Sequence, residues 1–344
     1  MQQLIRTMRI PIIAAALFAS VLITDAVQDS TPIAAGDTLS GTLSDNATNF
    51  SYDLARSTTP ILITAKSSEF TPKVGLALSG GQGGSFSVSF DGDVGNPLFI
   101  PPLPEGTIAQ VQVSTSQFPA VGFFTVSAAA VDATPIGAGQ TLDGQIGTDG
   151  VPQFFSFDAQ VGKLVTVVAA GGTFDTSLKL FAPSAIKSSA ADNDGGVGYD
   201  PEIYQAVLSG SGAGYIEVAP TFVGDSGGFR LTLTVSDPPK LDENTPSTLR
   251  LGGERGSDGL MFAGAAGGKA EITVHSVSGD TTGATIAVYQ DGIRLIWDDR
   301  YDPDGSGTYQ IDTQTGSPVY IIITADKHFD QAKEGQFEVS FKRL

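Results

Sequence analysis

The sequence predicts an all-β protein made of tandem antiparallel β-sandwich domains, placed after an N-terminal signal segment. Two observations lead to this fold class. Most apolar segments alternate apolar and polar residues at a period of two, which places one face of each strand in a core and the other in water. In addition, one pattern of about 105 residues occurs three times along the chain. Turn-forming residues separate the segments, as in antiparallel sandwiches.

The middle copy of the pattern is the clearest. An acidic turn at residues 192–195 and the segment Tyr199-Asp-Pro-Glu202 lie between its fourth and fifth strands. The strands predicted for this copy are residues 139–146, 154–158, 164–168, 175–181, 214–218 and 229–235. The spacing of turns and alternating runs is that of a complete sandwich module.

The flanking copies repeat the same order of strands and turns. In the first, residues 91–93 are predicted to form the acidic turn; in the third, Trp297-Asp-Asp299 precedes Tyr301-Asp-Pro-Asp304 as the turn precedes Tyr199-Asp-Pro in the middle copy. The other matching segments are 36–41, 50–54, 61–64 and 123–126 in the first copy, and 249–251, 270–274, 286–289, 319–323 and 337–341 in the third. A shared order is stronger evidence of duplication than any single match.

These matches divide the chain into domains at residues 30–132, 133–237 and 247–344. The connections at 131–135 and 236–246 are rich in proline and polar residues. The second connection is predicted to be extended and stiff, and to hold the third domain away from the second like beads on a string.

Residues 1–26 are predicted to be a secretory signal peptide. Arg6 and Arg9 precede an apolar run at 12–23 that is short for a membrane span. Cleavage after Ala26 is expected, with retention as an N-terminal anchor as the alternative. The sequence therefore predicts a secreted or cell-surface protein with no membrane span once the signal is cleaved.

Charge and cysteine content narrow the function classes. With 37 acidic and 19 basic residues the formal charge is −18, which disfavours binding to nucleic acid or an anionic membrane and favours cation binding. A plainly solvated acidic surface is the alternative. The chain has no cysteine, so it forms neither a disulfide framework nor a thiolate metal site.

Acidic residues gather in the turns of the second and third copies, where they are candidate calcium ligands. Calcium takes about six to eight oxygen ligands, and carboxylates alternating with glycine allow a loop to curl around one ion. The candidate ligands are Asp192, Asp194, Asp200 and Glu202 in the second copy and Asp298, Asp299, Asp302 and Asp304 in the third. The alternative is that Asp, Asn and Gly form turns without a metal.

Catalytic chemistry is not predicted. The string Gly224-Asp-Ser-Gly-Gly228 resembles the nucleophile segment of chymotrypsin-like proteases, but the only histidines, His275 and His328, follow Ser226, the reverse of the order in that family. The string is interpreted as a turn before a strand. No histidine pair has zinc-hydrolase spacing, and a hydrolase that uses two carboxylates is the last-ranked alternative.

Three aromatic residues of the third copy, Tyr289, Trp297 and Tyr301, raise the possibility of a stacking platform for sugar or peptide. Trp297 shares strand parity with Ile293 and Leu295. Packing of Trp297 in the core is therefore the favoured interpretation.

The middle copy resembles the bacterial pre-peptidase C-terminal domain. The residues that carry the resemblance are 139–144, 155–157, 175–178, Leu180, 192–194, Tyr199-Asp-Pro201 and 214–218. The resemblance covers residues 133–237, and the flanking copies match weakly. It implies a jelly-roll-like sandwich, extracellular deployment, frequent calcium binding in acidic loops, and a role in substrate binding, secretion or stability of an attached enzyme.

No peptidase domain precedes these modules, so a stand-alone role is expected. The leading functional hypothesis is a secreted, non-catalytic protein that binds an extracellular polysaccharide, a protein or the cell surface, with loops stabilised by calcium. One alternative is a structural subunit of a surface layer or filament that self-associates through strand edges. A second is an accessory protein of a secreted peptidase.

Overall fold

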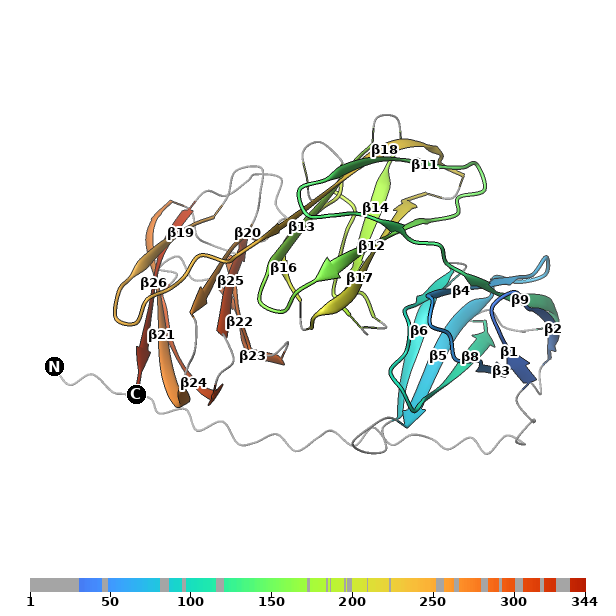
Figure 1. Ribbon diagram of the computed structural model, residues 1–344, viewed down its shortest axis with the longest axis horizontal. Coiled ribbons are helices and arrows are strands. Elements are labelled where there is room, and N and C mark those ends of the chain that lie inside the picture. Colours follow the sequence, from blue (N-terminus) through green and yellow to red (C-terminus); the bar gives the residue numbers. More distant parts are fainter. Residues whose placement is uncertain are drawn as a thin grey trace.

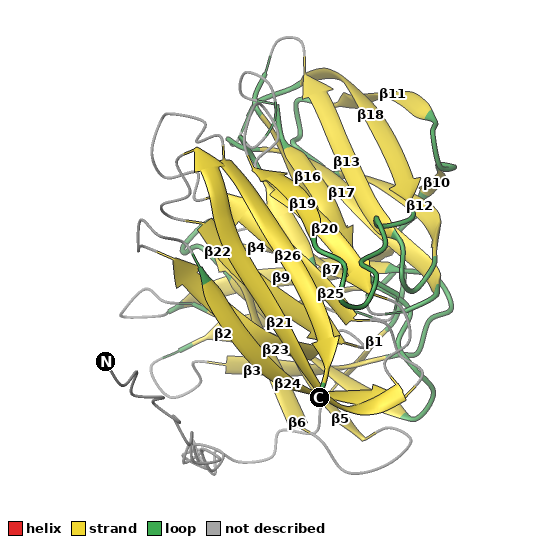
Figure 2. Ribbon diagram, turned by 90° about the vertical axis from the view of Figure 1, so that its left-hand side faces the viewer, coloured by secondary structure: helices red, strands yellow, loops and turns green. Residues whose placement is uncertain are grey.

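The computed structural model describes residues 31–344 except for a number of short segments. The segments of this range outside the description are 45–48, 81–86, 95–96, 116–120, 172–173, 184, 186, 195, 197–199, 209, 223, 252–256, 263–265, 280–283, 291–292, 301–305, 316–318 and 326–334. Every regular element among the described residues is a strand, and the strands form six sheets (Figures 1 and 2). The predicted all-β class of tandem antiparallel sandwiches is confirmed.

The first unit has two sheets, with strand orders β1-β3-β8-β5-β6 and β2-β9-β4-β7. Its strands are β1 (Thr31–Ile33), β2 (Thr38–Leu43), β3 (Asn49–Leu54), β4 (Ile61–Lys66), β5 (Lys73–Gly80), β6 (Ser87–Val94), β7 (Leu98–Ile100), β8 (Thr107–Ser114) and β9 (Gly122–Ala130). All pairs are antiparallel except β1 with β3. Residues 91–93 were expected to form an acidic turn. They lie instead within β6, paired with β5, so that expectation was wrong.

The second unit repeats this topology, with sheets β10-β12-β17-β14-β15 and β11-β18-β13-β16. Its strands are β10 (Thr134–Pro135), β11 (Thr141–Ile146), β12 (Gln153–Ala159), β13 (Leu164–Gly171), β14 (Thr176–Phe181), β15 (Ala190–Asp192), β16 (Glu202–Val207), β17 (Gly212–Pro220) and β18 (Gly227–Ser236). The parallel strand recurs: Thr134 of β10 is opposite Phe155, as Thr31 of β1 is opposite Tyr52.

The third unit has the sheets β19-β26-β21-β24 and β20-β25-β22-β23. Its strands are β19 (Ser247–Leu251), β20 (Ser257–Phe262), β21 (Ala266–Gly279), β22 (Ala284–Gln290), β23 (Ile293–Arg300), β24 (Gly307–Thr315), β25 (Val319–Ala325) and β26 (Gly335–Arg343). The strand order matches the other units, except that no parallel strand corresponding to β1 or β10 occurs among its described residues.

Each unit buries its own core between its two sheets, because the alternating residues of both sheets face inward. A large phenylalanine from the strand next to the edge lies in each core: Phe124, Phe229 and Phe337. In the first two units this ring lies over a glycine of the neighbouring strand, Gly41 or Gly144, where a Cβ atom would overlap the ring. These glycines therefore make room for the aromatic ring.

The connection between the second and third units is not a free spacer, contrary to the expectation from its prolines. Leu241 is buried in the core of the third unit, and the amide of Asn244 donates to the carbonyl of Phe341 at 2.8 Å. At the other end, Lys163 Nζ lies 2.6 Å from Asp237 Oδ1. The strands β16 and β20 also contact each other across this boundary. Packing of Leu241 outweighs the tendency of the prolines to hold the chain away from its neighbours.

Candidate functional site

The predicted metal ligands of the second unit lie around the segment that joins β15 to β16. Asp192 ends β15, and its Oδ2 accepts a hydrogen bond from the amide of Glu202 at 2.9 Å. The carboxylate of Asp200 accepts one from the amide of Gly171, also at 2.9 Å. Asp194 is exposed, whereas Glu202 is the buried first residue of β16. Two of the four carboxylates thus bind main-chain amides and fix the segment, as turn chemistry does.

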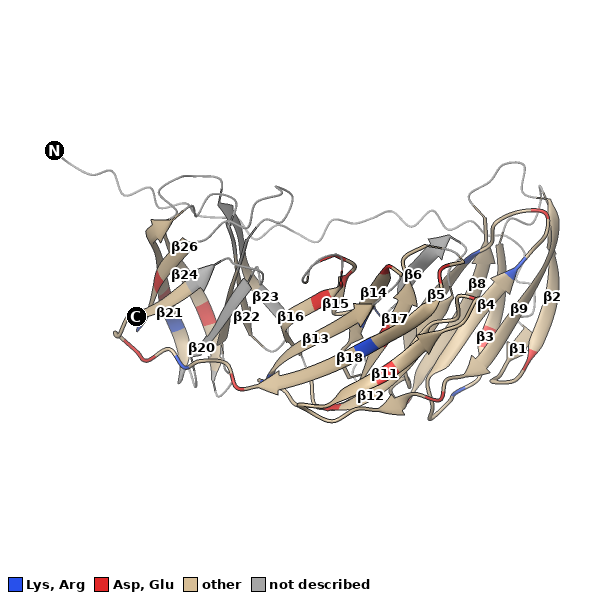
Figure 3. Cartoon of the chain, turned by 90° about the horizontal axis from the view of Figure 1, so that it is seen from above, with Lys and Arg blue, Asp and Glu red and all other residues tan. Residues whose placement is uncertain are grey.

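The structure does not bring a calcium ligand set together in the part of the chain that it describes. No group of three or more His, Asp or Glu side chains there is placed to hold a metal ion. Asp302 and Asp304 lie outside the described residues. Calcium binding therefore stays a prediction. Figure 3 shows that acidic residues occur on all three units.

Asp298 and Asp299 were expected in a turn and lie in a strand instead. Both belong to β23, opposite Ile286 and Thr285 of β22. The apolar and β-branched residues of 293–297 extend the hairpin from β22 far enough to include the two aspartates. Trp297 is also in β23, opposite Ala287, and its side chain and Tyr301 lie outside the description, so the stacking hypothesis is untested.

The protease-like string at 224–228 leads into β18, which begins at Gly227, so Ser226 precedes the strand. His275, on β21 of the third unit, makes a 2.6 Å hydrogen bond through Nδ1 with Ser306 Oγ. His328 is outside the described residues. The described histidine therefore already has a hydroxyl partner in its own unit.

The first and second units share an aromatic cluster that the alternation pattern did not predict. Phe99 of β7 stacks on Phe154 of β12, with ring centroids 4.6 Å apart, and lies 4.8 Å from Phe181 and 5.5 Å from Tyr215. All four rings are buried, with Phe99 only 3% exposed. Burial raises the pKa of the Tyr215 hydroxyl above its ordinary value. Aromatic pairs at these distances add to the stabilisation from buried area.

The cluster forms on the outer face of a sheet. In β12, Phe155 and Phe157 face the core of the second unit, so Phe154 points to the other side, where water would be expected. The same holds for Phe181 beside Leu180, and for Tyr215 beside Ile216. The sequence signal for this second buried face was a pair or run of adjacent large apolar residues, as at 98–100 and 154–155. Alternation breaks at such places because both faces of the strand are buried.

A small groove of about 320 Å³ lies beside this cluster. Leu62 and Val131 line it from the side of the first unit, and Val151 and Phe154 from the second. The charged residue in the lining of this groove is Asp132. Ligand sites often occur where two domains meet.

A larger open groove of about 1030 Å³ lies on the second unit itself and is the candidate functional site. Its lining includes both apolar side chains and hydrogen-bonding groups. The polar lining residues are Gln140, Ser156, Asp158, Gln160, Lys163, Ser236 and Asp237. Asp158 Oδ2 accepts a 3.5 Å hydrogen bond from Gln160 Nε2, and Lys163 pairs with Asp237.

The path of the connection between β10 and β11 produces this groove. The amide of Ile136 donates to the Ser156 carbonyl on one sheet, and that of Gly139 donates to the Leu233 carbonyl on the other. The connection thus crosses between the sheets, while β12 continues to Ala159 and β18 to Ser236. The ends of these two strands therefore border an uncovered space.

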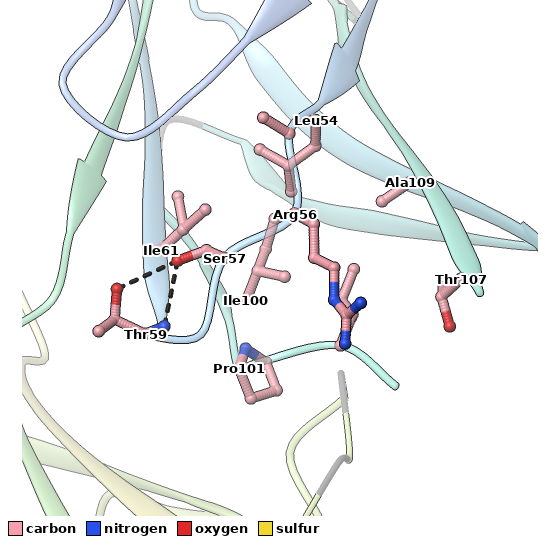
Figure 4. A pocket seen from close by; sticks show the side chains of 11 residues that line it. Leu54, Arg56, Ser57, Thr59, Ile61, Ile100, Pro101, Thr107 and Ala109 are labelled. Carbon is pink, nitrogen blue, oxygen red and sulfur yellow. Dashed lines mark hydrogen bonds between the residues drawn. The ribbon is translucent and has the colours of Figure 1, made fainter. Parts of the chain in front are cut away.

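A third opening, in the first unit, is too small to bind a ligand. Figure 4 shows Arg56, Pro101 and Thr107 around it, with Ser57 Oγ accepting from the amide of Thr59 at 3.1 Å. Its volume of about 20 Å³ holds about one water molecule.

Comparisons with known proteins give weak similarities. No protein-family model matches the sequence, and no curated protein matches it. Among solved structures, the pre-peptidase C-terminal domain of a collagenase from Bacillus anthracis is 15% identical, with a TM-score of 0.25, and covers 31% of this chain and 95% of its own.

Two further solved structures also show a weak similarity to this chain. The CUB1-EGF-CUB2 domains of rat MASP-1 are 8% identical, with a TM-score of 0.18, over 60% of this chain and 99% of theirs. A protein described as a secreted protein of Eubacterium rectale is 6% identical, with a TM-score of 0.21, over 59% of this chain and 74% of its own. Similarity at this level carries no argument about what the chain does.

Proposed function

We propose that the chain is an exported, non-catalytic binding protein whose second unit binds a polar extracellular polymer, a polysaccharide or an extended protein segment. The observation that carries the proposal is the open groove of the second unit. It combines a volume suited to several sugar or amino-acid residues with amide, hydroxyl, carboxylate and ammonium groups along its sides. The leader of residues 1–26 supports export.

The position of the groove favours binding over chemistry. Its charged side chains are Asp158, Lys163 and Asp237, and the lysine is already paired with Asp237 at 2.6 Å. No histidine lines it. The polar groups are spread along the border between two strand ends, an arrangement that can follow the repeating groups of a polymer.

The test is retention of residues 27–344 on insoluble polysaccharides, isolated cell envelope and immobilised protein polymers. We expect retention on one of these materials, and expect Asp158→Asn and Gln160→Ala to reduce it at least severalfold. Asp149→Asn is the matched control, because Asp149 is exposed in the same unit and does not line the groove. Retention on none of the materials, or equal retention of all variants, would overturn the proposal.

Calcium is a proposed part of this function, and its candidate ligands in the second unit are Asp192, Asp194, Asp200 and Glu202, which an ion would have to draw together from the positions that they have in the structure. An ion that binds only the folded state raises the stability by about 2.7 kcal/mol at a hundredfold excess over Kd. We therefore expect calcium, but not magnesium, to raise the melting temperature relative to chelator, and Asp200→Ala to remove the difference. Equal melting temperatures in calcium and chelator would leave these residues as turn formers.

A further inference from the structure

In each of the three units, one sheet ends in an edge strand at the same topological position. These three edge strands differ in length. The strands are β7, β16 and β24, of 3, 6 and 9 residues respectively. An edge strand presents unpaired main-chain amides and carbonyls, to which another strand can add. The third unit therefore has the longest such edge.

The first two units protect this edge. In the first, β7 is short, and Pro101 and Pro102 follow it directly. In the second, Pro201 precedes β16, the register of its pairing with β13 is irregular between Val165 and Val167, and Gln205 has a φ of 49°. Short length, prolines and irregular backbone are the devices by which natural sheets prevent pairing at an edge.

The edge of β24 has none of these devices. It contains no proline, lysine or arginine, and it pairs regularly with β21 from Gly268 opposite Thr313 to Val274 opposite Gly307. The Thr313 hydroxyl donates to the Gly268 carbonyl at 3.0 Å and adds to this pairing. The result is a nine-residue edge strand that pairs with β21 without a bulge.

The hydrogen bonds of Gln314, near the C-terminal end of β24, show which main-chain groups of this strand point away from β21. The amide of Gln314 donates to Gln290 Oε1 at 2.9 Å, and its carbonyl accepts from Gln290 Nε2 at 3.1 Å. Gln290 belongs to the other sheet, so the main-chain groups of Gln314 point away from β21. Main-chain direction alternates along a strand. The main-chain groups of Thr308, Gln310 and Asp312 therefore point away as well, and outside the strand ladders no main-chain hydrogen bond to them occurs among the described residues.

We propose that a second copy of the chain pairs with this edge, β24 against β24 in antiparallel orientation, with Gln310 opposite Gln310 of the second copy. A two-fold axis through this pair joins the two four-stranded sheets into one. Thr308 of each copy is then opposite Asp312 of the other. Because all three residues direct their main-chain groups outward, each of the three residue pairs forms its hydrogen bonds.

This register places compatible side chains opposite each other. On the inner face, Tyr309 is opposite Ile311 of the second copy, an aromatic and β-branched pair that favours sheet formation. On the exposed face, each Asp312 carboxylate is opposite a threonine hydroxyl. A register centred on Asp312 would place two carboxylates opposite each other, which destabilises a sheet. The chain's sequence thus favours pairing about Gln310.

The chain contains no cysteine, so a single introduced thiol tests the register in residues 27–344. Cα atoms of a hydrogen-bonded antiparallel pair are about 5.5 Å apart, within the range of about 4.4–6.8 Å that a disulfide spans. Gln310→Cys should therefore give a disulfide-linked dimer on mild oxidation. Thr308→Cys is the matched control, because the two thiols would be about 14 Å apart along the strands.

Sedimentation equilibrium measures the association without a cross-link. We expect a dimer that strengthens with added salt, because the formal charge of −18 on each copy repels the other. Gln310→Lys should weaken it at least tenfold, whereas Thr234→Lys, at an exposed position of a central strand, should not. A monomer at every concentration, or equal cross-linking of Gln310→Cys and Thr308→Cys, would overturn the proposal.

Discussion

The two junctions of this chain join similar units by different means. Between the first and second units, Phe99 lies among three buried rings of its neighbour. Between the second and third, strand β16 contacts β20, the Tyr320 hydroxyl lies close to Gly162, and Leu241 of the connection belongs to the core of the third unit. The first junction has a buried aromatic cluster of its own, whereas no such cluster occurs at the second among the described residues. We therefore expect the first junction, where outer strand faces carry aromatic residues, to couple its two units more strongly than the second junction does.

The largest effect is expected from Phe229→Ala. It empties the centre of the second core and leaves Gly144 uncovered, so the second unit should lose about 3–5 kcal/mol. Because the first unit shares the aromatic cluster, its unfolding should shift to lower temperature as well, while that of the third unit should not. Calorimetry of the whole chain checks this. A shift of all three units together would show that the junctions are equivalent.

Phe99→Ala tests the aromatic junction itself. Removing a ring buried among three others should cost about 2–4 kcal/mol of coupling between the units. The first two units should then unfold in separate transitions, and protease should cut between residues 130 and 134. Phe123→Ala is the control, because that ring is 52% exposed. Unchanged cooperativity in Phe99→Ala would refute the coupling.

A smaller effect is expected at Tyr52, where the first unit differs from the second. Its buried hydroxyl has no hydrogen-bond partner among the described residues, and the position opposite Thr134 in the second unit is Phe155. Tyr52→Phe should therefore stabilise the first unit by up to about 1 kcal/mol. Urea unfolding measures the difference, and a marked loss of stability would indicate that the hydroxyl is bonded.

The same residue gives a dependence on pH. Burial raises the pKa of Tyr52 above its ordinary value of 10.0, so the folded state keeps a proton that the unfolded state releases. The resulting stability is fully present below pH 10 and is lost as the pH rises through the higher folded pKa. Tyr52→Phe should show a smaller loss over that alkaline range.

The smallest effect is expected from the ion pair of the second unit that lies where the connection to the third unit begins. Lys163→Ala removes an ion pair whose aspartate is 77% exposed, and such pairs contribute about 0–1 kcal/mol. The melting temperature of the third unit should change by less than that of the first unit in Phe99→Ala. A loss as large as that from Phe99→Ala would contradict the contrast between the junctions.

Period-two alternation predicted most of the fold, because each strand has one face in a core. The strands around Phe155, Leu178 and Ile216 were located from it within a few residues. Alternation could not reveal the aromatic junction, since it gives the buried face within a unit but not what covers the other face. The burial of Phe154 and Phe181 depends on their contact with Phe99 of the first unit, which the sequence pattern of the second unit does not contain.

The acidic segments were harder to predict, for a different reason. Aspartate is common in turns, but neighbouring apolar residues can extend a hairpin through it, as they do at Asp298 and Asp299. The candidate groove was not predicted at all. It depends on where the connection at 136–140 crosses between two sheets, which brings Asp158 and Asp237 together from distant parts of the sequence.

Hydrogen exchange on residues 27–344, with and without the polymer that retains the protein best, tests the proposed function most directly. The account expects slower exchange at the ends of β12 and β18, around Asp158 and Val235, and unchanged exchange in the aromatic junction. Protection confined to the third unit, or no protection at any groove residue, would contradict binding by the second unit.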